Sequence, residues 1–464
     1  GMKSFDSVYI IGIGGIGTSA LARYFASEGY PVAGYDRTPS PLTAELESEG
    51  IDIHYTDDVT LIDPRYKHPG RTLVIYTPAV PHDMGELTYY RDGGYDVLKR
   101  SEVLGVVTEG KYCMAVAGTH GKSSTTTMLA WFNACAADDG DGTVGSGSAF
   151  MGGISKNFGS NIHLGGGRRV AVEADEFDRS FLRLHPDVAL ISSTDADHLD
   201  IYGTHEALRE GFSLFAGQIK KGGALIVRKG VTLPRYPEGV SLYTYSSDDD
   251  KADFHAVGCR ADEQGRYMFD IVCPDRTIKG CHLGIPGRVN VENCVGAVAM
   301  MWVAGFDEDR LREAIESFRG VKRRMDVQYH GDDRIYIDDY AHHPEELRRT
   351  ICSVREMFPG KSVTAVFQPH LYTRTRDFAD DFARSLSAVD RLVMLPIYPA
   401  REEPIEGVDS RMILDAVTAP EKSLVGKEEL LDVLRADDGD VLITFGAGDI
   451  DRFVELIREM LEKR

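Results

Sequence analysis

The segment Met114-Ala115-Val116-Ala117-Gly118-Thr119-His120-Gly121-Lys122-Ser123-Ser124 decides the fold of the middle of this chain. Its four leading apolar residues predict a buried strand, the glycines permit a tight turn, and the residues that follow predict a helix from about Ser123 to Ala136. At such a helix N-terminus, backbone N–H groups and a lysine can bind the phosphates of ATP, and a hydroxyl can bind Mg²⁺. We therefore expect a phosphate-binding loop formed by Gly118, Thr119, His120, Gly121, Lys122, Ser123 and Ser124.

This loop departs from the usual GxxxxGK[ST] pattern, because Val116 stands at the position of the first glycine. The alternative interpretation is a glycine turn with an incidental surface lysine. The apolar strand before the loop and the helix after it favour phosphate binding.

A second glycine-rich turn, Gly12-Ile13-Gly14-Gly15-Ile16-Gly17, lies near the N-terminus. It follows an apolar strand predicted at 7–11, precedes a helix predicted at 20–28, and is followed by a strand at 32–35 that ends before Asp36. The GxGxxG spacing with a later acidic residue is typical of dinucleotide-binding proteins, in which the glycines let the backbone approach a diphosphate. Alone, this motif indicates either an NAD enzyme or a structural glycine turn.

Two acidic motifs follow predicted strands of the middle segment. Glu173-Ala174-Asp175-Glu176 comes after the strand at 170–172, and Asp195-Ala196-Asp197-His198-Leu199-Asp200 comes after the strand at 188–191. The carboxyl ends of parallel strands form the edge where α/β sheets bind ligands, so both motifs should face the phosphate loop. Carboxylate and imidazole ligands could complete a Mg²⁺ site together with nucleotide phosphates, although an isolated histidine in an acidic turn is more often a surface residue.

The 464 residues exceed what one hydrophobic core usually serves, so we expect several domains. The strand and helix pattern predicts an α/β fold with three domains at 1–108, 109–320 and 321–464. Residues 138–153 are rich in Gly, Asp and Ser and predict a mobile surface loop, and short alternating strands at 253–284 predict a β appendage. The last domain should contain a strand at 334–337, a helix at 344–357, a strand at 362–367 and a closing strand-loop-helix at 441–461.

Composition excludes several classes of function. With 52 basic and 73 acidic residues the formal charge is −21, which argues against binding to nucleic-acid backbones. No apolar run approaches the ~20 residues of a membrane span, and the N-terminus lacks the apolar core of a signal peptide. The seven cysteines form no CxxC pair and suit a reducing compartment, so we expect a cytoplasmic protein.

Taken together, five motifs closely resemble those of the Mur ligases. They are the loop AGTHGKSSTT (117–126), EADE (173–176), DADHLD (195–200), DDYAHHP (338–344) and FQPHLYTRTRD (367–377). Their order and spacing span the chain. The resemblance implies a Rossmann-like N-terminal domain that binds a UDP-sugar, a central P-loop ATPase-like domain with a parallel sheet, and a Rossmann-like C-terminal domain that binds the amino acid.

The resemblance also implies roles for individual residues. Gly14, Gly15 and Gly17, with Asp36 nearby, would bind the UDP-sugar, and Lys122 and Ser123 would engage ATP phosphates and Mg²⁺. The metal ligands would be Ser123, Glu173 and His198. Asn290, Asn293 and Arg324 match residues on the nucleotide side, whereas His343, Arg374 and Arg376 match residues at the amino-acid and acyl end. Apart from the family, His343 could simply be a helix-start residue beside Pro344.

Within the family, the motifs are most similar to the branch that uses ATP to join UDP-N-acetylmuramate to L-alanine through an acyl phosphate. The ligases that add later residues carry a carbamylated lysine where this chain has Phe212, so Phe212 indicates the L-alanine branch or its tripeptide-recycling relative. The glycine loop favours the former. Val289, Ala341 and Leu371 depart from common family residues, and Leu371 replaces an arginine close to Arg374 and Arg376. An arginine fork there would bind the α-carboxylate of the acceptor, and we expect Arg376 to have the larger effect on the KM for L-alanine. An NAD-dependent oxidoreductase and a nucleotide-binding regulator remain as alternatives from other classes.

Overall fold

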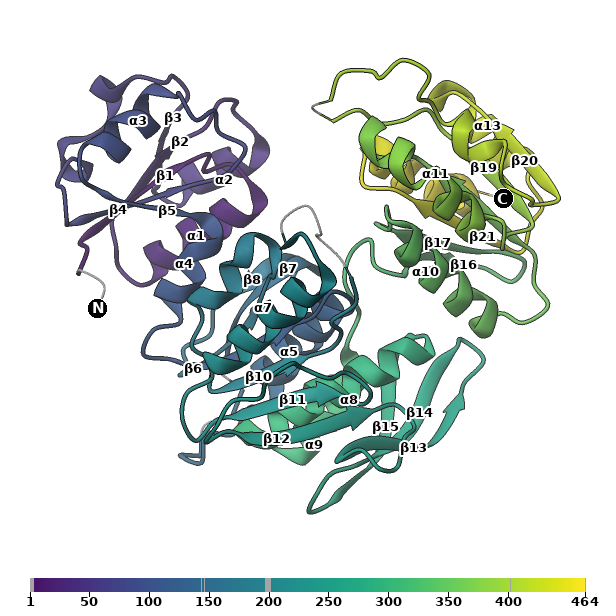
Figure 1. Ribbon diagram of the computed structural model, residues 1–464, viewed down its shortest axis with the longest axis horizontal. Coiled ribbons are helices and arrows are strands. Elements are labelled where there is room, and N and C mark those ends of the chain that lie inside the picture. Colours follow the sequence, from purple (N-terminus) through teal and green to yellow (C-terminus); the bar gives the residue numbers. More distant parts are fainter. Residues whose placement is uncertain (1–3, 143, 146, 197–201, 401, 464) are drawn as a thin grey trace. The chain divides into compact units, whose positions relative to one another are not determined.

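The computed structural model describes residues 4–142, 144–145, 147–196, 202–400 and 402–463. It confirms the expected α/β class, with three separate and mostly parallel sheets along the chain (Figure 1). The described chain divides into two compact units. The first contains 1–259, 269–282 and 292–318, and the second contains 260–268, 283–291 and 319–464.

The first sheet has five parallel strands in the order β3-β2-β1-β4-β5, as in a Rossmann-like domain. The central strand is buried on both faces, because Val8 and Ile10 pack into one apolar cluster while Tyr9 and Ile11 pack into another. The elements are β1 (Ser7–Ile11), α1 (Ile16–Ser27), β2 (Val32–Tyr35), α2 (Pro41–Ser48), β3 (Asp52–His54), η1 (Val59–Leu61), η2 (Pro64–Tyr66), β4 (Thr72–Tyr76), α3 (Gly85–Asp92), β5 (Asp96–Lys99) and α4 (Arg100–Val107).

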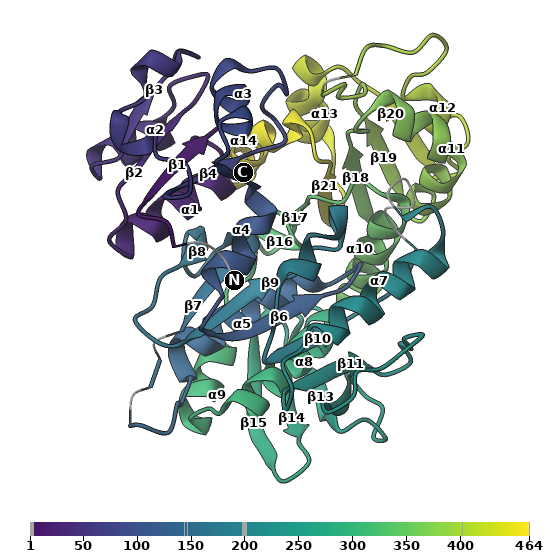
Figure 2. The ribbon, with the colours of Figure 1, turned by 60° about the vertical axis from the view of Figure 1, so that its left-hand side comes forward.

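The second sheet has ten strands in the order β15-β14-β13-β12-β11-β10-β6-β9-β7-β8. Figure 2 shows β10, β6 and β9 side by side in its middle. The strands are β6 (Tyr112–Ala117), β7 (Ser148–Ser155), β8 (Ser160–His163), β9 (Arg169–Glu173), β10 (Val188–Ile191), β11 (Ala224–Arg228), β12 (Ser241–Ser246), β13 (Phe254–Ala261), β14 (Arg266–Val272) and β15 (Thr277–Pro286). The helices are α5 (Lys122–Ala136), η3 (Phe177–Arg183), α7 (His205–Gly217), α8 (Arg288–Ala304) and α9 (Glu308–Ser317).

The chain reverses its direction across this sheet at β6. After β6 it builds β7, β8 and β9 on one side, and then β10, β11 and β12 on the other. Such a reversal leaves a crevice at the carboxyl ends of the strands, where α/β proteins bind ligands. The phosphate loop after β6 and the acidic motif after β9 both lie at this edge.

The prediction of one surface loop over residues 138–153 was wrong in its second half. Strand β7 begins at Ser148, and its first four residues are buried where it pairs in parallel with β9. The glycines that flank Ala149-Phe150-Met151 hid this short apolar strand, whose stability comes from pairing with a strand distant in the sequence.

The third sheet has six strands in the order β16-β17-β21-β18-β19-β20, antiparallel only between β16 and β17. Helix α10 buries Leu347 and Ile351 in the cluster on one face, and α14 buries Ile457 in the cluster on the other. The strands are β16 (Asp326–His330), β17 (Ile335–Asp339), β18 (Val363–Phe367), β19 (Arg391–Met394), β20 (Glu421–Leu424) and β21 (Val441–Phe445). The helices are α10 (Pro344–Met357), α11 (Tyr372–Leu386), α12 (Arg411–Leu414), η4 (Lys427–Glu429), α13 (Leu430–Ala436), η5 (Asp449–Phe453) and α14 (Val454–Glu462).

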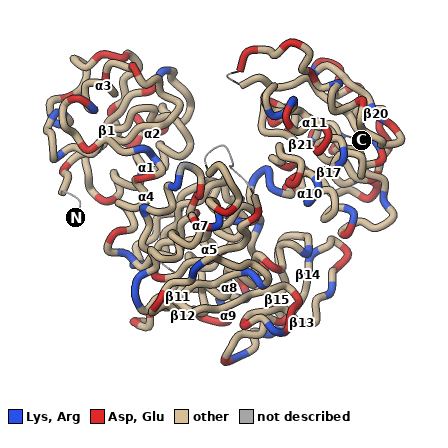
Figure 3. The backbone as a smooth tube through the Cα atoms, viewed as in Figure 1, with Lys and Arg blue, Asp and Glu red and all other residues tan. Residues whose placement is uncertain are grey.

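Acidic and basic residues are interspersed along the described chain (Figure 3). Among the described helices, none combines the length and the apolar composition that crossing a bilayer requires.

Candidate active site

The phosphate loop connects the end of β6 to the start of α5 and depends on two glycines. Gly118 has φ +141° and Gly121 has φ +76°, both in the region that favours glycine. A Cβ atom on Gly118 would also lie 2.0 Å from Ser192 Oγ. The loop is held against the strand next to β6, because the Thr119 N–H donates to the Ser193 carbonyl at 3.1 Å. Its shape is therefore fixed by packing against the end of β10.

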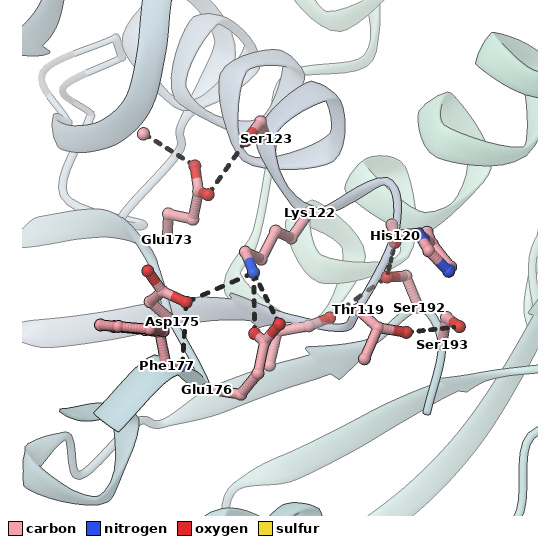
Figure 4. Close-up of polar contacts among 12 residues, drawn as sticks. Thr119, His120, Lys122, Ser123, Glu173, Asp175, Glu176, Phe177, Ser192 and Ser193 are labelled. Atoms are coloured by element: carbon pink, nitrogen blue, oxygen red, sulfur yellow. Dashed lines mark hydrogen bonds and ion pairs between the residues drawn. The ribbon is translucent and has the colours of Figure 1, made fainter. Parts of the chain in front are cut away.

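Lys122 begins α5 and points toward the acidic motif that follows β9 (Figure 4). Its Nζ donates to both oxygens of Glu176, at 2.7 and 2.9 Å, and lies 3.4 Å from Asp175. Burial alone would lower the pKa of Lys122, but the carboxylates of Glu176, Asp175 and Glu173 together raise it above its ordinary value. The lysine is therefore a fixed positive charge at the N-terminus of a helix, where phosphates bind.

Glu173 ends β9 and lies beside the hydroxyl of Ser123. Ser123 Oγ donates to Glu173 Oε1 at 3.0 Å, and the Gly152 N–H donates to Oε2 at 2.7 Å. Burial raises the pKa of the Glu173 carboxyl, although Lys122 opposes this. A carboxylate and a hydroxyl this close together form an oxygen donor set that fits Mg²⁺ when phosphates supply further ligands. The third expected ligand, His198, lies outside the described residues.

Asp195, the first residue of the second acidic motif, lies close to the phosphate loop. His120 Nε2 lies 3.7 Å from Asp195 Oδ2, and Ser192 Oγ donates to the His120 carbonyl. Residues that follow β9 and β10 thus flank the phosphate loop that follows β6. The positions of these three segments at the ends of neighbouring parallel strands predict this arrangement.

The two expected adenine-side asparagines have different surroundings. Thr125 Oγ1 donates to Asn293 Oδ1 at 3.3 Å, and a Cβ on Gly121 would lie 3.2 Å from the same oxygen, so Asn293 lies against the phosphate loop. Asn290 instead donates to the Pro286 carbonyl at 2.8 Å, at the start of its own helix α8.

The N-terminal glycine loop is held by Asp36. The Gly14 N–H donates to Asp36 Oδ2 at 2.7 Å, and a Cβ on Gly14 would lie at the same distance from that oxygen. Gly15 precedes the first turn of α1, and a Cβ on Gly17 would overlap the guanidinium of Arg100. Arg100 is a site residue that motif reasoning missed, because it follows β5 and reaches the loop only through the fold.

A pocket in the first compact unit is lined both by the N-terminal glycine loop and by the Glu173 carboxylate at the end of β9. Its lining includes Gly17, Arg100, Phe150, Asn161, Glu173 and Asp175. The two motifs, more than 150 positions apart in the sequence, therefore border one space.

The second compact unit brings together most of the residues expected at the amino-acid end. His343 precedes the first turn of α10, with its ring centroid 4.8 Å from that of His342, and the rings of His342 and His370 are 6.0 Å apart. Arg374 donates to His370 Nδ1 at 3.2 Å. Burial lowers the pKa of His342 to about 4 and also lowers that of His370. Both imidazoles are therefore neutral near pH 7.

Arg376 donates to the neighbouring Asp377 at 2.8 Å, whereas Arg374 contacts His370. Residues two positions apart on a helix point in different directions, which separates Arg376 from Arg374. Leu371, just before α11, has φ +72°, an uncommon conformation for a branched side chain. Arg324 places its guanidinium 5.4 Å from the centre of the Tyr340 ring and helps to stabilise the charged form of Asp339.

Three family profiles match successive parts of the chain. The descriptions are "Mur ligase family, catalytic domain" over residues 7–112, "Mur ligase middle domain" over 116–301 and "Mur ligase, glutamate ligase domain" over 323–448.

Similar proteins and structures extend over the whole chain. A UDP-N-acetylmuramate–L-alanine ligase of Parabacteroides distasonis is 51% identical, covering 100% of this chain and 99% of its own length, and one of Porphyromonas gingivalis is 49% identical, covering 98% and 99%. The crystal structure of UDP-N-acetylmuramate-alanine ligase MurC from Thermotoga maritima is 26% identical, with a TM-score of 0.76 and coverage of 98% and 99%. A murein peptide ligase from Psychrobacter arcticus, at 21% identity and a TM-score of 0.65 over 100% and 99%, shares the fold. The phosphate loop, its acidic partners and these full-length similarities have one explanation: the chain belongs to the Mur ligase family.

Proposed function

We propose that this chain is an ATP-dependent ligase that joins the carboxylate of UDP-N-acetylmuramate to the amine of L-alanine, in the synthesis of peptidoglycan precursors. The observation that carries the proposal is the cluster of Lys122, Ser123 and Glu173 at the start of α5, which provides a cation and an oxygen donor set for a nucleotide phosphate. The choice of substrates rests on full-length relatives named as ligases of this pair.

The first step activates the carboxylate. One of its oxygens attacks the γ-phosphorus of ATP, ADP leaves, and an acyl phosphate forms. Lys122 and the backbone N–H groups at the start of α5 would stabilise charge on the transferring phosphoryl group, chiefly by positioning and electrostatics. Ser123, Glu173 and His198 would hold Mg²⁺, which neutralises charge on the phosphates when bound.

The second step forms the amide bond. The amine of L-alanine attacks the acyl carbon, and the tetrahedral intermediate loses inorganic phosphate. His343 would orient the amine or accept its proton, a role that contributes about 10²–10⁴-fold where it operates. Arg374 would bind the α-carboxylate of the acceptor through charge-assisted hydrogen bonds, with Arg376 as the second candidate.

The UDP-sugar is assigned to the N-terminal sheet. Gly14, Gly15 and Gly17 would lie against its diphosphate at the start of α1, and Asp36 would keep the loop in shape through the Gly14 N–H. The adenine side of ATP is assigned to Asn290, Asn293 and Arg324. We retain 1–108, 109–320 and 321–464 as the UDP-sugar, ATP and amino-acid domains. Because ATP and UDP-sugars are cytoplasmic metabolites, we place the reaction in the cytoplasm.

Phe212 supports the choice of branch. Its side chain is fully buried on α7 and packs edge-to-face against Phe181, with ring centroids 5.6 Å apart. The carbamylated lysine of ligases that add later residues therefore has no counterpart at this position.

The deciding experiment measures phosphate release with UDP-N-acetylmuramate and each of L-alanine, glycine, L-serine and L-Ala-γ-D-Glu-diaminopimelate. We expect L-alanine to be used well, glycine and L-serine poorly, and the tripeptide hardly at all, with Lys122→Ala as the inactive control. Faster ligation of the tripeptide at equal concentration would assign the chain to the recycling branch. A nicotinamide absorbance change without amide product would instead indicate an oxidoreductase, and ATP binding without amide product would indicate a regulator.

A further inference from the structure

The start of α10 gathers three side chains that commonly bind metal ions. Ligand atoms of His342, His343 and Glu346 all lie within 4.8 Å of one another. Glu346 Oε2 lies 3.7 Å from His342 Nδ1, and both side chains are largely buried, at 24% and 18% exposure. The 3.7 Å contact places the Glu346 carboxylate beside the His342 ring, so the three side chains are close enough together to share one small cation.

We propose that His342, His343 and Glu346 form a binding site for a transition-metal dication, with Zn²⁺ as the ion that this ligand set fits best. Two imidazole nitrogens and one carboxylate are a common set of three protein ligands for Zn²⁺, with a fourth position left open. Mg²⁺ prefers oxygen ligands. This cluster has two imidazoles and one carboxylate, whereas the proposed Mg²⁺ site has two oxygen donors, Ser123 and Glu173, and one imidazole, His198.

Hydrogen bonds orient two of the three proposed ligands, His342 and Glu346. His342 Nδ1 lies 3.0 Å from the Tyr340 carbonyl oxygen, and because a carbonyl only accepts, Nδ1 must carry the proton. The Nε2 atom then keeps its lone pair, and this pairing of an imidazole with a backbone carbonyl is usual for histidines that bind metals. The His342 backbone N–H donates to Glu346 Oε2 at 3.1 Å and fixes that carboxylate beside the rings.

A competing explanation assigns Glu346 a purely structural role. It is the third residue of α10, and a carboxylate there can reach back to a backbone N–H before the helix. This explanation requires no affinity for metal ions, so metal binding distinguishes the two.

The test measures Zn²⁺ binding to the full-length protein by competition with a chromophoric chelator, without substrates and with excess Mg²⁺ to occupy oxygen-ligand sites. We expect one tightly bound Zn²⁺, and an affinity at least ~10-fold weaker in both His342→Gln and Glu346→Gln. Glu345→Gln and Cys352→Ser are matched controls on the same helix. Glu345 pairs with Arg348 and Arg349, and Cys352 is an exposed thiol. Both controls should bind Zn²⁺ like the wild type.

Circular dichroism and thermal unfolding will check that the variants fold. If the variants do not fold, the visible absorption of wild-type protein loaded with Co²⁺ still tests the proposed site. Four-coordinate Co²⁺ absorbs strongly, whereas the hydrated ion absorbs weakly. The proposal is overturned by a wild type that retains no Zn²⁺ against the chelator, by unchanged affinity in either variant, or by an equal loss in Glu345→Gln. A Co²⁺ spectrum like that of the hydrated ion would also overturn it.

A consequence for catalysis rests on the proposed function. Because His343 is assigned to the amino-acid end, bound Zn²⁺ should compete with L-alanine and raise its KM while leaving kcat unchanged. The binding measurement uses no substrate, so it stands even if the proposed reaction fails.

Discussion

The two carboxylate oxygens of Glu176 lie 2.7 and 2.9 Å from Lys122 Nζ, and the Glu176 side chain is fully buried. Removing the cation would leave a buried carboxylate without its main partner. We therefore expect Lys122→Met to lower the free energy of unfolding by about 3 kcal/mol, and the double variant Lys122→Met/Glu176→Gln to recover most of that loss. Amide hydrogen exchange of β6 and α5 would measure both. A double variant no more stable than the single one would show that the pair carries little coupling.

Glu173 should set the metal requirement of the reaction. Glu173→Ala removes the carboxylate that lies 3.0 Å from Ser123 Oγ, so the Mg²⁺ concentration for half-maximal activity should rise at least ~10-fold. His198→Ala should act in the same direction. A Mg²⁺ titration of phosphate release, with the exposed Glu238→Ala as control, tests each residue separately. A curve that coincides with the wild type removes that residue from the metal site.

The two arginines of α11 should have unequal effects on the acceptor. From the sequence we expect Arg376 to have the larger role, but the structure pairs Arg376 with Asp377 and places Arg374 beside His370. We now expect Arg374→Ala to raise the KM for L-alanine about tenfold or more, and Arg376→Ala to change it little. Steady-state kinetics with L-alanine as the varied substrate would show which is correct, and a larger effect of Arg376→Ala would restore the original assignment.

Asp339 should make the C-terminal sheet sensitive to pH. Burial raises its pKa from 3.8 to about 6. The pKa of Asp339 is higher in the folded protein than in the unfolded chain. The contribution of Asp339 to stability is therefore complete below pH 3.8 and is lost as the pH rises through 6. The stability of the wild type relative to Asp339→Asn should therefore fall by about 3 kcal/mol between pH 4 and pH 7.

Hydrogen exchange of β17, β18 and β21 across this pH range measures the change, with the exposed Asp333→Asn as control. A constant difference between wild type and Asp339→Asn would show that Asp339 does not titrate in this range.

Elements with strong local signals could be predicted from the sequence. Helix α10 spans the predicted residues 344–357, and α5 begins within one residue of its predicted start. In both, a proline or glycine marks the beginning and an apolar stripe follows. The family and the fold class were confirmed. Strand β7 was missed because its pairing with β9 outweighs its glycine-rich surroundings.

Site residues could be predicted only where a motif names them. Glu176 stands in a quoted motif, yet its pairing with Lys122 depends on the register of β6 against β9, which no short pattern contains. Arg100 and His370 lie in the site regions because separate elements converge there. Arg374 and Arg376 stand in one motif, but they lie two positions apart on α11, so the helical period turns their side chains in different directions.

The buried Phe212 has a consequence for what the cell must supply. A lysine carbamate forms by addition of carbon dioxide, so ligases that depend on one respond to the dissolved gas. With Phe212 enclosed beside Phe181 on α7, this chain has no amine there to capture it. Its rate should be the same in degassed and in bicarbonate-rich buffer, which leaves the proposed first amide bond of the peptide independent of the carbon dioxide level in the cell.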